Sequence, residues 1–525
     1  MEVCPPIHLM RSLLAMMCLV ATFALVCMMH ATRPMSGLSV VGAAVTASPP
    51  PAVGAFAKPA AAVRFWHLTD VHINLWHQRH GDTEDMCRSA SSNASRRPGR
   101  FGHFNCDPDL TAVELAVAHM VQEEPAPDFI LFGGDVFGHV PASRENAPSV
   151  RKSHEALALA LQERFSHTAV LPCLGNHDTH PYFVLGAEAG DALSTMANLY
   201  GSALKPSERK TLIQRGYYVH KLRRNRLWVV VLETNALSIP SASVAADLQL
   251  SWLEHVLKGA ALHAVSVLIL GHIAPGASHI DFNSMAAAGW SGGGWTARSQ
   301  AVFYRLLREN GRLAGRISAM LFGHLHTGSV RLLRPTAGEK TASWASDVPL
   351  DLDRGSALAV GDYGDEEAND ATMPVMYLSP SLTSRNPTPH RGGLRLYTLS
   401  SPPSRRQPLH LTDIDEYSFE LDASNAQGKP LWTAASVRSS LNLSSLTYIA
   451  WRRWAHSLRD DATFGWLMSA QRCADEVEPD YAKCKASVVC AHTELEVEGY
   501  IKCLQAIRQN AIRPSAWAEA VKRAV

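Results

Sequence analysis

Short apolar runs recur along the chain, and each run ends at polar side chains. A run holds four to seven residues that are mostly aliphatic or β-branched. Runs of this length without polar alternation are typical of strands buried on both faces of a sheet. The six runs, with the polar residues that end them, occupy residues 63–72, 128–135, 168–178, 226–235, 264–272 and 317–326. Two later runs, 375–382 and 393–400, predict strands that pair without a helix between them.

Between several of these runs lie segments whose apolar residues recur at helical spacing. They are residues 108–124, 149–165, 245–258 and 299–310. Alternating strands and helices predict an α/β fold. In open α/β sheets, functional polar residues gather just beyond the carboxyl ends of the strands. The polar residues that end the runs are therefore the first candidates for a site.

These strand-end residues are of the kinds that bind metal ions. In chain order the motifs are D-x-H at Asp70 and His72, G-G-D at Asp135, G-N-H-D at residues 175–178, G-H at His272, and G-H-x-H at His324 and His326. Any one motif is equally explained by a loop histidine or by a turn with an Asx cap. Their recurrence in this order, always at a strand end, is hard to obtain by chance and predicts one shared metal site.

Composition and charge limit which partners are expected and indicate how the chain is divided. The 49 Lys and Arg residues nearly balance the 48 Asp and Glu residues, so no nucleic-acid partner is expected. Residues 12–29 form an uncharged apolar run, which predicts a signal peptide or signal anchor within residues 1–34. Residues 35–62 are rich in Pro and Ala and predict a linker. We expect a catalytic domain at 63–415 and a helical, cysteine-containing region at 416–525.

Cysteine usage agrees with an exported chain. Cys173 lies in an apolar run and is expected to be a free, buried thiol. The disulfide candidates are Cys87 and Cys106, which bracket a polar loop, and the C-terminal Cys473, Cys484, Cys490 and Cys503. Asn93 and Asn442 lie in glycosylation sequons. We expect secretion, or the lumen of lysosomes or endosomes, with anchoring through the N-terminal segment as the alternative.

Together the motifs resemble the calcineurin-like metallophosphoesterase family, and within it acid sphingomyelinase and the acid sphingomyelinase-like phosphodiesterases. The segments that carry this resemblance are "LTDVHINLWH", "GGDVFGHV", "LGNHDTHPYF", "ILGHIAPG" and "LFGHLHTGSV". The resemblance spans residues 63–414. It implies an α/β (α+β) fold, a four-layer α/β/β/α sandwich with a C-terminal helical, disulfide-bonded subdomain. It also implies a phosphodiesterase with two metal ions.

By this resemblance, two cations share the carboxylate of Asp135. One ion takes Asp70, His72, Asp135 and His326, and the other takes Asp135, Asn176, His272 and His324. Histidine nitrogens with few carboxylates favour zinc, so two Zn²⁺ per chain are expected. Cations about 3.5–4 Å apart can clamp both oxygens of a phosphoryl displacement. The expected nucleophile is a metal-bridging hydroxide, because zinc lowers the pKa of bound water to about 7.

Two histidines outside this set are expected to face the phosphate, again by resemblance. His177 should hydrogen-bond a phosphoryl or leaving oxygen. His139 is a general-acid candidate, because a leaving alkoxide needs a proton. The alternative for His139 is an ordinary loop histidine on the rim. Trp290 and Trp295 are candidate contacts for a choline-like group, with packed loop tryptophans as the alternative.

The sequence also departs from acid sphingomyelinase. No six-cysteine saposin domain fits before residue 63, which favours the sphingomyelinase-like enzymes, some of which take soluble phosphodiesters. A polar insertion at 334–372 predicts a surface loop. Purple-type phosphomonoesterase activity is not expected, because no tyrosine follows Asp135 in "GGDVFGHV".

The leading prediction is a zinc phosphodiesterase that splits sphingomyelin into ceramide and phosphocholine. One alternative is hydrolysis of nucleotides or other small soluble phosphodiesters. Another is a metal-free lipid-binding pseudoenzyme, against which the complete ligand set argues. The expected partner is a phospholipid or small phosphodiester, with peripheral membrane contact and a monomeric chain.

Overall fold

The structure is a computed structural model, and it describes residues 62–183, 189–222, 226–276, 294–333, 373–385, 392–400 and 407–457. Several predictions concern residues outside these ranges. They are the signal peptide or anchor, the linker up to residue 61, the insertion at 334–372, Trp290, and Cys473, Cys484, Cys490 and Cys503. Among the described residues, no helix is long and apolar enough to cross a membrane.

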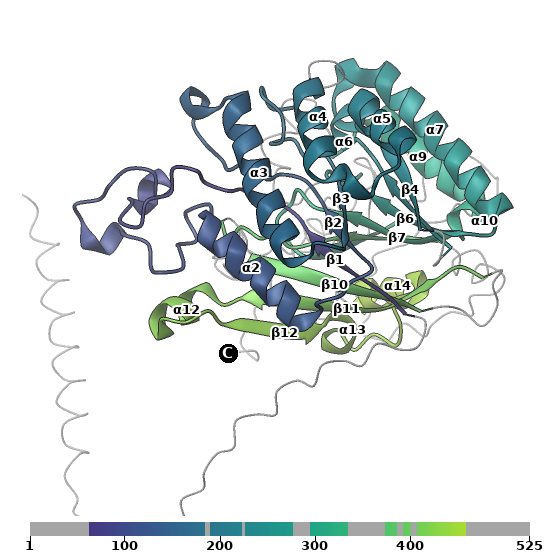
Figure 1. Cartoon of the computed structure of the whole chain (residues 1–525). Coiled ribbons are helices and arrows are strands. Elements are labelled where there is room, and N and C mark those ends of the chain that lie inside the picture. The colour runs from purple at the N-terminus through teal and green to yellow at the C-terminus, as the bar shows by residue number, and fades with distance from the viewer. Residues whose placement is uncertain are drawn as a thin grey trace, which may run out of the picture. The chain divides into compact units, whose positions relative to one another are not determined.

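Within the described ranges, the strands form two six-stranded sheets (Figure 1). The first sheet has the order β12-β11-β10-β1-β2-β3. Its strands are β1 (Val63–Leu68), β2 (Phe129–Phe132), β3 (Ala169–Pro172), β10 (Gly392–Ser400), β11 (His410–Phe419) and β12 (Trp432–Ser436). Strands β1, β2 and β3 run parallel, whereas β10, β11 and β12 join antiparallel.

The second sheet has the order β4-β5-β6-β7-β9-β8. Its strands are β4 (Tyr218–Leu222), β5 (Leu227–Val231), β6 (Ser266–Leu270), β7 (Ile317–Phe322), β8 (Ser329–Leu332) and β9 (Val375–Leu378). The four central strands are parallel, and the edge strands β4 and β8 are antiparallel. The central strands are buried almost throughout, as the continuous apolar runs predict.

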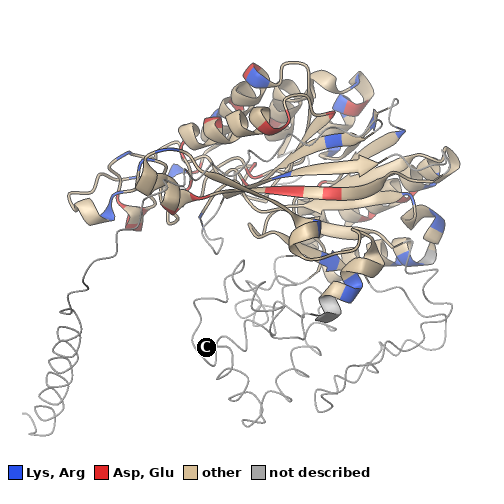
Figure 2. Cartoon of the chain, turned by 90° about the horizontal axis from the view of Figure 1, so that it is seen from below, with Lys and Arg blue, Asp and Glu red and all other residues tan. Residues whose placement is uncertain are grey.

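Helices flank the two sheets (Figure 1). The longer ones are α2 (Leu110–Glu123), α3 (Ala147–Arg164), α4 (Gly190–Leu199), α5 (Pro206–Arg215), α7 (Ser243–Leu262), α9 (Ala297–Glu309) and α14 (Tyr448–Ser457). The shorter ones are α6 (Thr234–Ser238), α10 (Gly311–Ala314), α12 (Leu421–Gln427) and α13 (Val437–Ser440). Short 3₁₀ turns lie at Thr83–Asp85, Ala94–Arg96, Ala142–Arg144, Gly201–Ala203 and Pro240–Ala242. Figure 2 shows acidic and basic residues mixed on the helices, with uncharged residues over most of the strands.

Side-chain caps fix where the predicted helices begin. Asp109 accepts the Ala112 N–H and starts α2, and Asn146 accepts the Ser149 N–H and starts α3. Thr296 caps α9 in the same way. Such caps satisfy backbone N–H groups that have no partner within the helix.

The two sheets pack face to face through aromatic side chains. Phe65 of β1 stacks on Phe129 and Tyr397, at ring-centroid distances of 4.7 and 5.3 Å. Tyr397 in turn contacts Tyr377 of the second sheet at 6.3 Å. His67 of β1 also reaches across, with Nδ1 2.7 Å from Ser379 Oγ. The predicted α/β fold, with two sheets and flanking helices, is confirmed.

The first sheet continues past the domain boundary predicted at residues 415 and 416. Strand β11 passes through that position, and β12 pairs with it as the edge strand. In the chain, α12 precedes the edge strand β12, and α13 and α14 follow it. The region after residue 415 therefore contains strands of the first sheet as well as helices, and α12 lies between its last two strands.

Candidate metal centre

The candidate ligands come together beyond the carboxyl ends of parallel strands from both sheets. Asp70 and His72 follow β1, Asp135 follows β2 and Asn176 follows β3, whereas His272 follows β6 and both His324 and His326 follow β7. Three groups of possible ligand atoms form, each with its atoms within 4.8 Å of one another. Two contain a carboxylate, namely Asp70 with His72 and His326, and Asp135 with His272 and His324. The third contains histidines alone, His72 with His139 and His177.

The backbone at these positions adopts an uncommon conformation. Asp70, His72, Asp135, His324 and His326 all have positive φ angles, between 51° and 70°. Such angles are rare outside glycine and persist only where surrounding contacts enforce them. Here backbone hydrogen bonds connect the loop after β1 to the loop after β2. The Asp70 N–H donates to Gly134 O at 2.9 Å, and the His72 N–H donates to Asp135 O at 3.0 Å.

Two glycines of the motifs are required by close packing. Gly134 has a φ of 91°, a conformation that L side chains rarely adopt. Gly175 lies directly against Asp135, and a Cβ there would overlap Asp135 Oδ1. The glycines of the G-G-D and G-N-H-D motifs therefore let the two loops approach each other at the site.

Hydrogen bonds to backbone carbonyls orient three of the imidazoles. Nδ1 of His72 lies 2.9 Å from Phe137 O, and Nδ1 of His272 lies 2.8 Å from Gly133 O. Nδ1 of His326 lies 3.4 Å from Arg385 O. A carbonyl oxygen only accepts, so we assign the proton to Nδ1 in each ring. The Nε2 lone pairs then face the interior of the site, as in histidines that bind metals.

These lone pairs point at other acceptors. Nε2 of His72 and Nε2 of His326 are only 3.1 Å apart. Nε2 of His272 lies 3.0 Å from Asn176 Oδ1 and 3.1 Å from Asp135 Oδ2. Convergent lone pairs at such distances repel unless a cation or a proton lies among them. The donor set therefore fits divalent cations.

The electrostatics of the carboxylates supports the same conclusion. Asp70 and Asp135 are almost completely buried. Burial raises the pKa of Asp70 to about 7. Burial also acts to raise the pKa of Asp135, but the His272 imidazole, whose Nε2 lies 3.1 Å from Oδ2, outweighs it and holds this pKa well below its usual range. Positive charge at this position is what keeps the buried carboxylate ionised.

His139 and His177 lie beside the candidate ligands. The His139 ring stacks on His72 with centroids 4.0 Å apart, and it contacts His177 at 4.7 Å. The side chain of His139 is 24% exposed, so it lies at the open side of the cluster rather than on a remote rim. Nδ1 of His177 is buried and has no hydrogen-bond partner among the described residues. Burial lowers the pKa of His177 to about 4, so its imidazole is neutral.

Asp178 is a structural residue of the site to which the sequence motif assigns no role. Its carboxylate accepts the backbone N–H groups of Asp135, Val136 and Gly175, at 2.8 to 2.9 Å. Nε2 of the buried His154 lies 3.4 Å from the same carboxylate. Asp178 thus ties the loop that carries Asp135 to its own loop. Its place in G-N-H-D is the only sequence signal that marks it.

We expect Asp178→Ala to weaken metal binding roughly 10- to 100-fold, the range for residues that orient metal ligands. The free energy of unfolding should fall by several kcal/mol, since each buried N–H left without an acceptor costs about 1–3 kcal/mol. Zinc titration and thermal unfolding measure the two effects. Asp247→Ala is the control, because its exposed ion pair with Arg298 should contribute little. Unchanged metal affinity in Asp178→Ala would contradict the orienting role.

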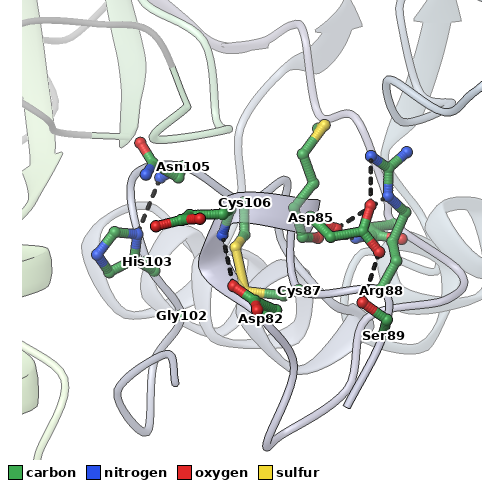
Figure 3. The surroundings of a disulfide bond; sticks show 12 residues. Asp82, Asp85, Cys87, Arg88, Ser89, Gly102, His103, Asn105 and Cys106 are labelled. Carbon is green, nitrogen blue, oxygen red and sulfur yellow. Dashed lines mark hydrogen bonds and ion pairs between the residues drawn. A yellow bond between two sulfur atoms is a disulfide. The ribbon is translucent and has the colours of Figure 1, made fainter. Parts of the chain in front are cut away.

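Other predicted residues lie away from the cluster or make different contacts. Trp295 is fully buried, and its Nε1 donates to Ile273 O at 2.8 Å, so it packs in the core rather than offering a face to substrate. Cys87 and Cys106 form a disulfide with a Cα–Cα distance of 5.7 Å (Figure 3). Cys173 is a buried free thiol, as predicted. Asn93 and Asn442 are both exposed.

Comparison with known proteins agrees with this geometry. Residues 63–328 match the Calcineurin-like phosphoesterase family. Acid sphingomyelinase-like phosphodiesterase 3b of Homo sapiens is 27% identical over 86% of this chain and 92% of its own length. Cyclic GMP-AMP phosphodiesterase SMPDL3A of Homo sapiens is 26% identical over 77% of this chain and 79% of its own length. Among solved structures, a dimetal phosphatase from Danio rerio aligns over 68% of this chain and 96% of that chain, with 12% identity and a TM-score of 0.38.

These matches confirm the resemblance to sphingomyelinase-like phosphodiesterases and the prediction of a hydrolase of the phosphodiesterase kind. The family implies a dinuclear metal site, and the structure contains groups of His and Asp side chains that could hold metal ions. The family match covers more than half of the chain, from β1 to the loop after β7. The chain belongs to the calcineurin-like phosphoesterase family.

Proposed function

We propose that the chain is a two-zinc phosphodiesterase that cleaves diesters whose leaving group is a poorly acidic alcohol. The observation that carries this proposal is the pair His139 and His177 beside the candidate ligands. A metal site alone does not require these imidazoles. A departing alkoxide does, because it must gain a proton as the bond to phosphorus breaks.

The proposed ligands are Asp70, His72, Asp135, Asn176, His272, His324 and His326. Oδ2 of Asp135 suits a bridging position, since it lies 3.7 Å from His72 Nε2 and 3.1 Å from His272 Nε2. Five histidine or amide donors with only two carboxylates favour zinc over magnesium or calcium. When bound, the cations would activate a water molecule and stabilise the charge on the phosphoryl oxygens.

The two remaining histidines have different proposed roles: His177 binds a phosphoryl oxygen, and His139 donates a proton. Nδ1 of His177 is buried and has no hydrogen-bond partner among the described residues, which supports the proposed role of hydrogen-bonding a phosphoryl oxygen. His139 gives a proton from its ring to the leaving oxygen. Water supplies the hydroxyl on phosphorus and gives its other proton to solvent, the P–O bond to the alcohol breaks, and the alcohol departs neutral. His139 regains its proton from solvent.

The leading substrate is sphingomyelin, which would yield ceramide and phosphocholine. The names of relatives that contain "acid sphingomyelinase-like" and "Sphingomyelinase" support this choice. A nucleotide diester is the second candidate, supported by the relatives named cyclic GMP-AMP phosphodiesterase. Both substrates release an alkoxide, so both suit the role given to His139.

The proposed compartment is extracellular or the lumen of lysosomes and endosomes. The Cys87–Cys106 disulfide supports it, because disulfides persist mainly in oxidising compartments. In that setting the substrate would be lipid in an outer or lumenal leaflet, or nucleotide released from cells.

A parallel assay tests the proposed function. Zinc-loaded full-length protein is incubated with sphingomyelin in mixed micelles, cyclic GMP-AMP, bis(p-nitrophenyl) phosphate and p-nitrophenyl phosphate, at acidic and neutral pH. We expect phosphocholine release and hydrolysis of the aryl diester, with little hydrolysis of the monoester. Turnover of cyclic GMP-AMP without sphingomyelin would favour the second candidate. Hydrolysis of the monoester alone would contradict the proposal.

A further inference from the structure

The buried carboxylate of Asp107 holds His139 through both its main chain and its side chain. Asp107 is only 1% exposed. Its Oδ2 accepts the His139 backbone N–H at 2.7 Å. Nδ1 of the His139 ring lies 3.1 Å from Oδ2 and 3.2 Å from Oδ1. The sequence motifs do not single out Asp107, which stands 32 residues before its partner.

This carboxylate is itself fixed in place. The Thr383 hydroxyl donates to Oδ1 at 3.3 Å. Burial acts to raise the pKa of Asp107, but the His139 imidazole outweighs it and holds this pKa below its usual value. Asp107 is therefore ionised and can only accept hydrogen bonds. The proton shared with it must sit on Nδ1 of His139.

The Cys87–Cys106 disulfide links the two chain segments that contact His139. Asp107 directly follows Cys106, and Arg88 directly follows Cys87. Arg88 donates from Nη1 to His139 O at 3.3 Å, so the residue after each half-cystine contacts His139. Arg88 is held in turn by Asp85, through its backbone carbonyl at 3.1 Å and its carboxylate at 3.5 Å (Figure 3). The disulfide thus joins the two segments whose residues Arg88 and Asp107 form hydrogen bonds with His139.

We propose that Asp107 is the positioning residue for His139, holding its Nδ1–H so that Nε2–H of the imidazolium is the group that protonates the leaving oxygen. This inference rests on the proposed function, in which His139 is the proton donor. An imidazole free to turn would present either ring nitrogen, in either tautomer. A carboxylate on Nδ1 removes that freedom, as it does for the imidazoles of catalytic triads.

The competing role is purely structural. Asp107 could stabilise only the loop of His139, in which case its loss would slow the hydrolysis of every substrate alike. Positioning predicts a selective effect instead. Diesters with a poor leaving group need the proton, whereas diesters with an activated aryl leaving group do not.

Asp107→Asn in the full-length, zinc-loaded protein tests the inference. Asparagine has nearly the same size but no charge, and its NH₂ group replaces one of the two carboxylate oxygens that lie within 3.2 Å of His139 Nδ1, so its hold on Nδ1–H is weaker. We expect a roughly 10- to 100-fold lower rate on sphingomyelin or cyclic GMP-AMP, whichever the enzyme hydrolyses. The rate on bis(p-nitrophenyl) phosphate and the zinc content should change far less. An equal loss on both kinds of substrate would overturn the inference.

A double-mutant cycle shows whether Asp107 acts through His139. Residues that act as one unit have non-additive effects. Adding Asp107→Asn to His139→Ala should therefore cause no further loss on the poor-leaving-group substrate. A full additional loss would overturn the inference. If His139→Ala itself shows no dependence on the leaving group, both the inference and the proposed role of His139 fail.

Asp109→Ala is the matched control in the same loop. Asp109 accepts the Ala112 N–H at 3.0 Å as the cap of α2, and within the described part of the chain it forms no hydrogen bond with His139. The control should lower the melting temperature yet leave the ratio of the two rates unchanged. A readout without turnover is the ¹⁵N spectrum of the metal-free protein with labelled histidines, assigned by comparison with His139→Ala. Protonation of His139 at Nδ1 in the parent and its change in Asp107→Asn support positioning, and an unchanged spectrum overturns it.

Discussion

Asp135→Ala should remove bound metal and phosphodiesterase activity together. Asp135 is the carboxylate that lies near ligands of both groups, with Oδ2 close to His72 and His272. Without it, neither cation retains a complete set of donors, and two groups of histidine lone pairs remain without a neutralising charge between them. We expect zinc content to fall from about two ions per chain toward none, and turnover to fall to background.

Two further variants make this result interpretable. Asp135 also accepts the His177 N–H at 2.7 Å, so Asp135→Asn, which keeps one oxygen for that bond, guards against a simple failure to fold. Asp128→Ala is the matched control, because Asp128 precedes the same strand that Asp135 follows and binds the Arg64 N–H at 2.8 Å instead. The control should keep its zinc. Turnover that persists in Asp135→Asn after its metal is gone would refute the two-cation site.

His139→Ala should slow the hydrolysis of alkyl phosphodiesters by about 10²- to 10⁴-fold, the range expected for loss of a general acid. We expect zinc to stay bound, because His139 stacks on the ligand His72 but belongs to neither of the two groups that contain a carboxylate. Rates on sphingomyelin or a nucleotide diester are compared with rates on bis(p-nitrophenyl) phosphate, whose leaving group needs no proton.

The control for this variant is His180→Ala, an exposed histidine on the neighbouring loop. It should leave both rates near those of the parent protein. If His139→Ala slows the aryl and alkyl diesters to the same extent, His139 is not the proton donor, and a role in substrate binding would replace the one proposed.

Sequence patterns could predict the strands of the site because those strands are buried on both faces. The runs before Asp70, Asp135 and His272 contain few polar residues, and this follows directly from burial in parallel sheets. Helices α4 and α5 were not predicted. Helix α5 is largely polar, α4 has only ten residues, and their packing on β4 and α3 depends on the tertiary fold. Similarly, the runs at 375–382 and 393–400 did not indicate that they join different sheets.

The candidate ligands were predictable because each one stands in a short motif at a strand end. Asp107 was not, because its partner is 32 residues away and carboxylate-to-imidazole pairing leaves no local pattern. The hydrogen bonds that Asp178 accepts from the backbone of Asp135 and Val136 could not be predicted from the sequence for the same reason. Trp295 was offered as a substrate contact because it follows a glycine-rich stretch, but its indole fills the core.

The measurement that tests the two-cation site most directly is a zinc titration of metal-free parent protein beside metal-free Asp135→Asn. Bound zinc and the rate on bis(p-nitrophenyl) phosphate are followed in the same samples. The account predicts that the parent gains activity as about two ions bind per chain, while Asp135→Asn gains neither. Full activity in the metal-free parent, or saturation of activity at one ion per chain, would contradict it.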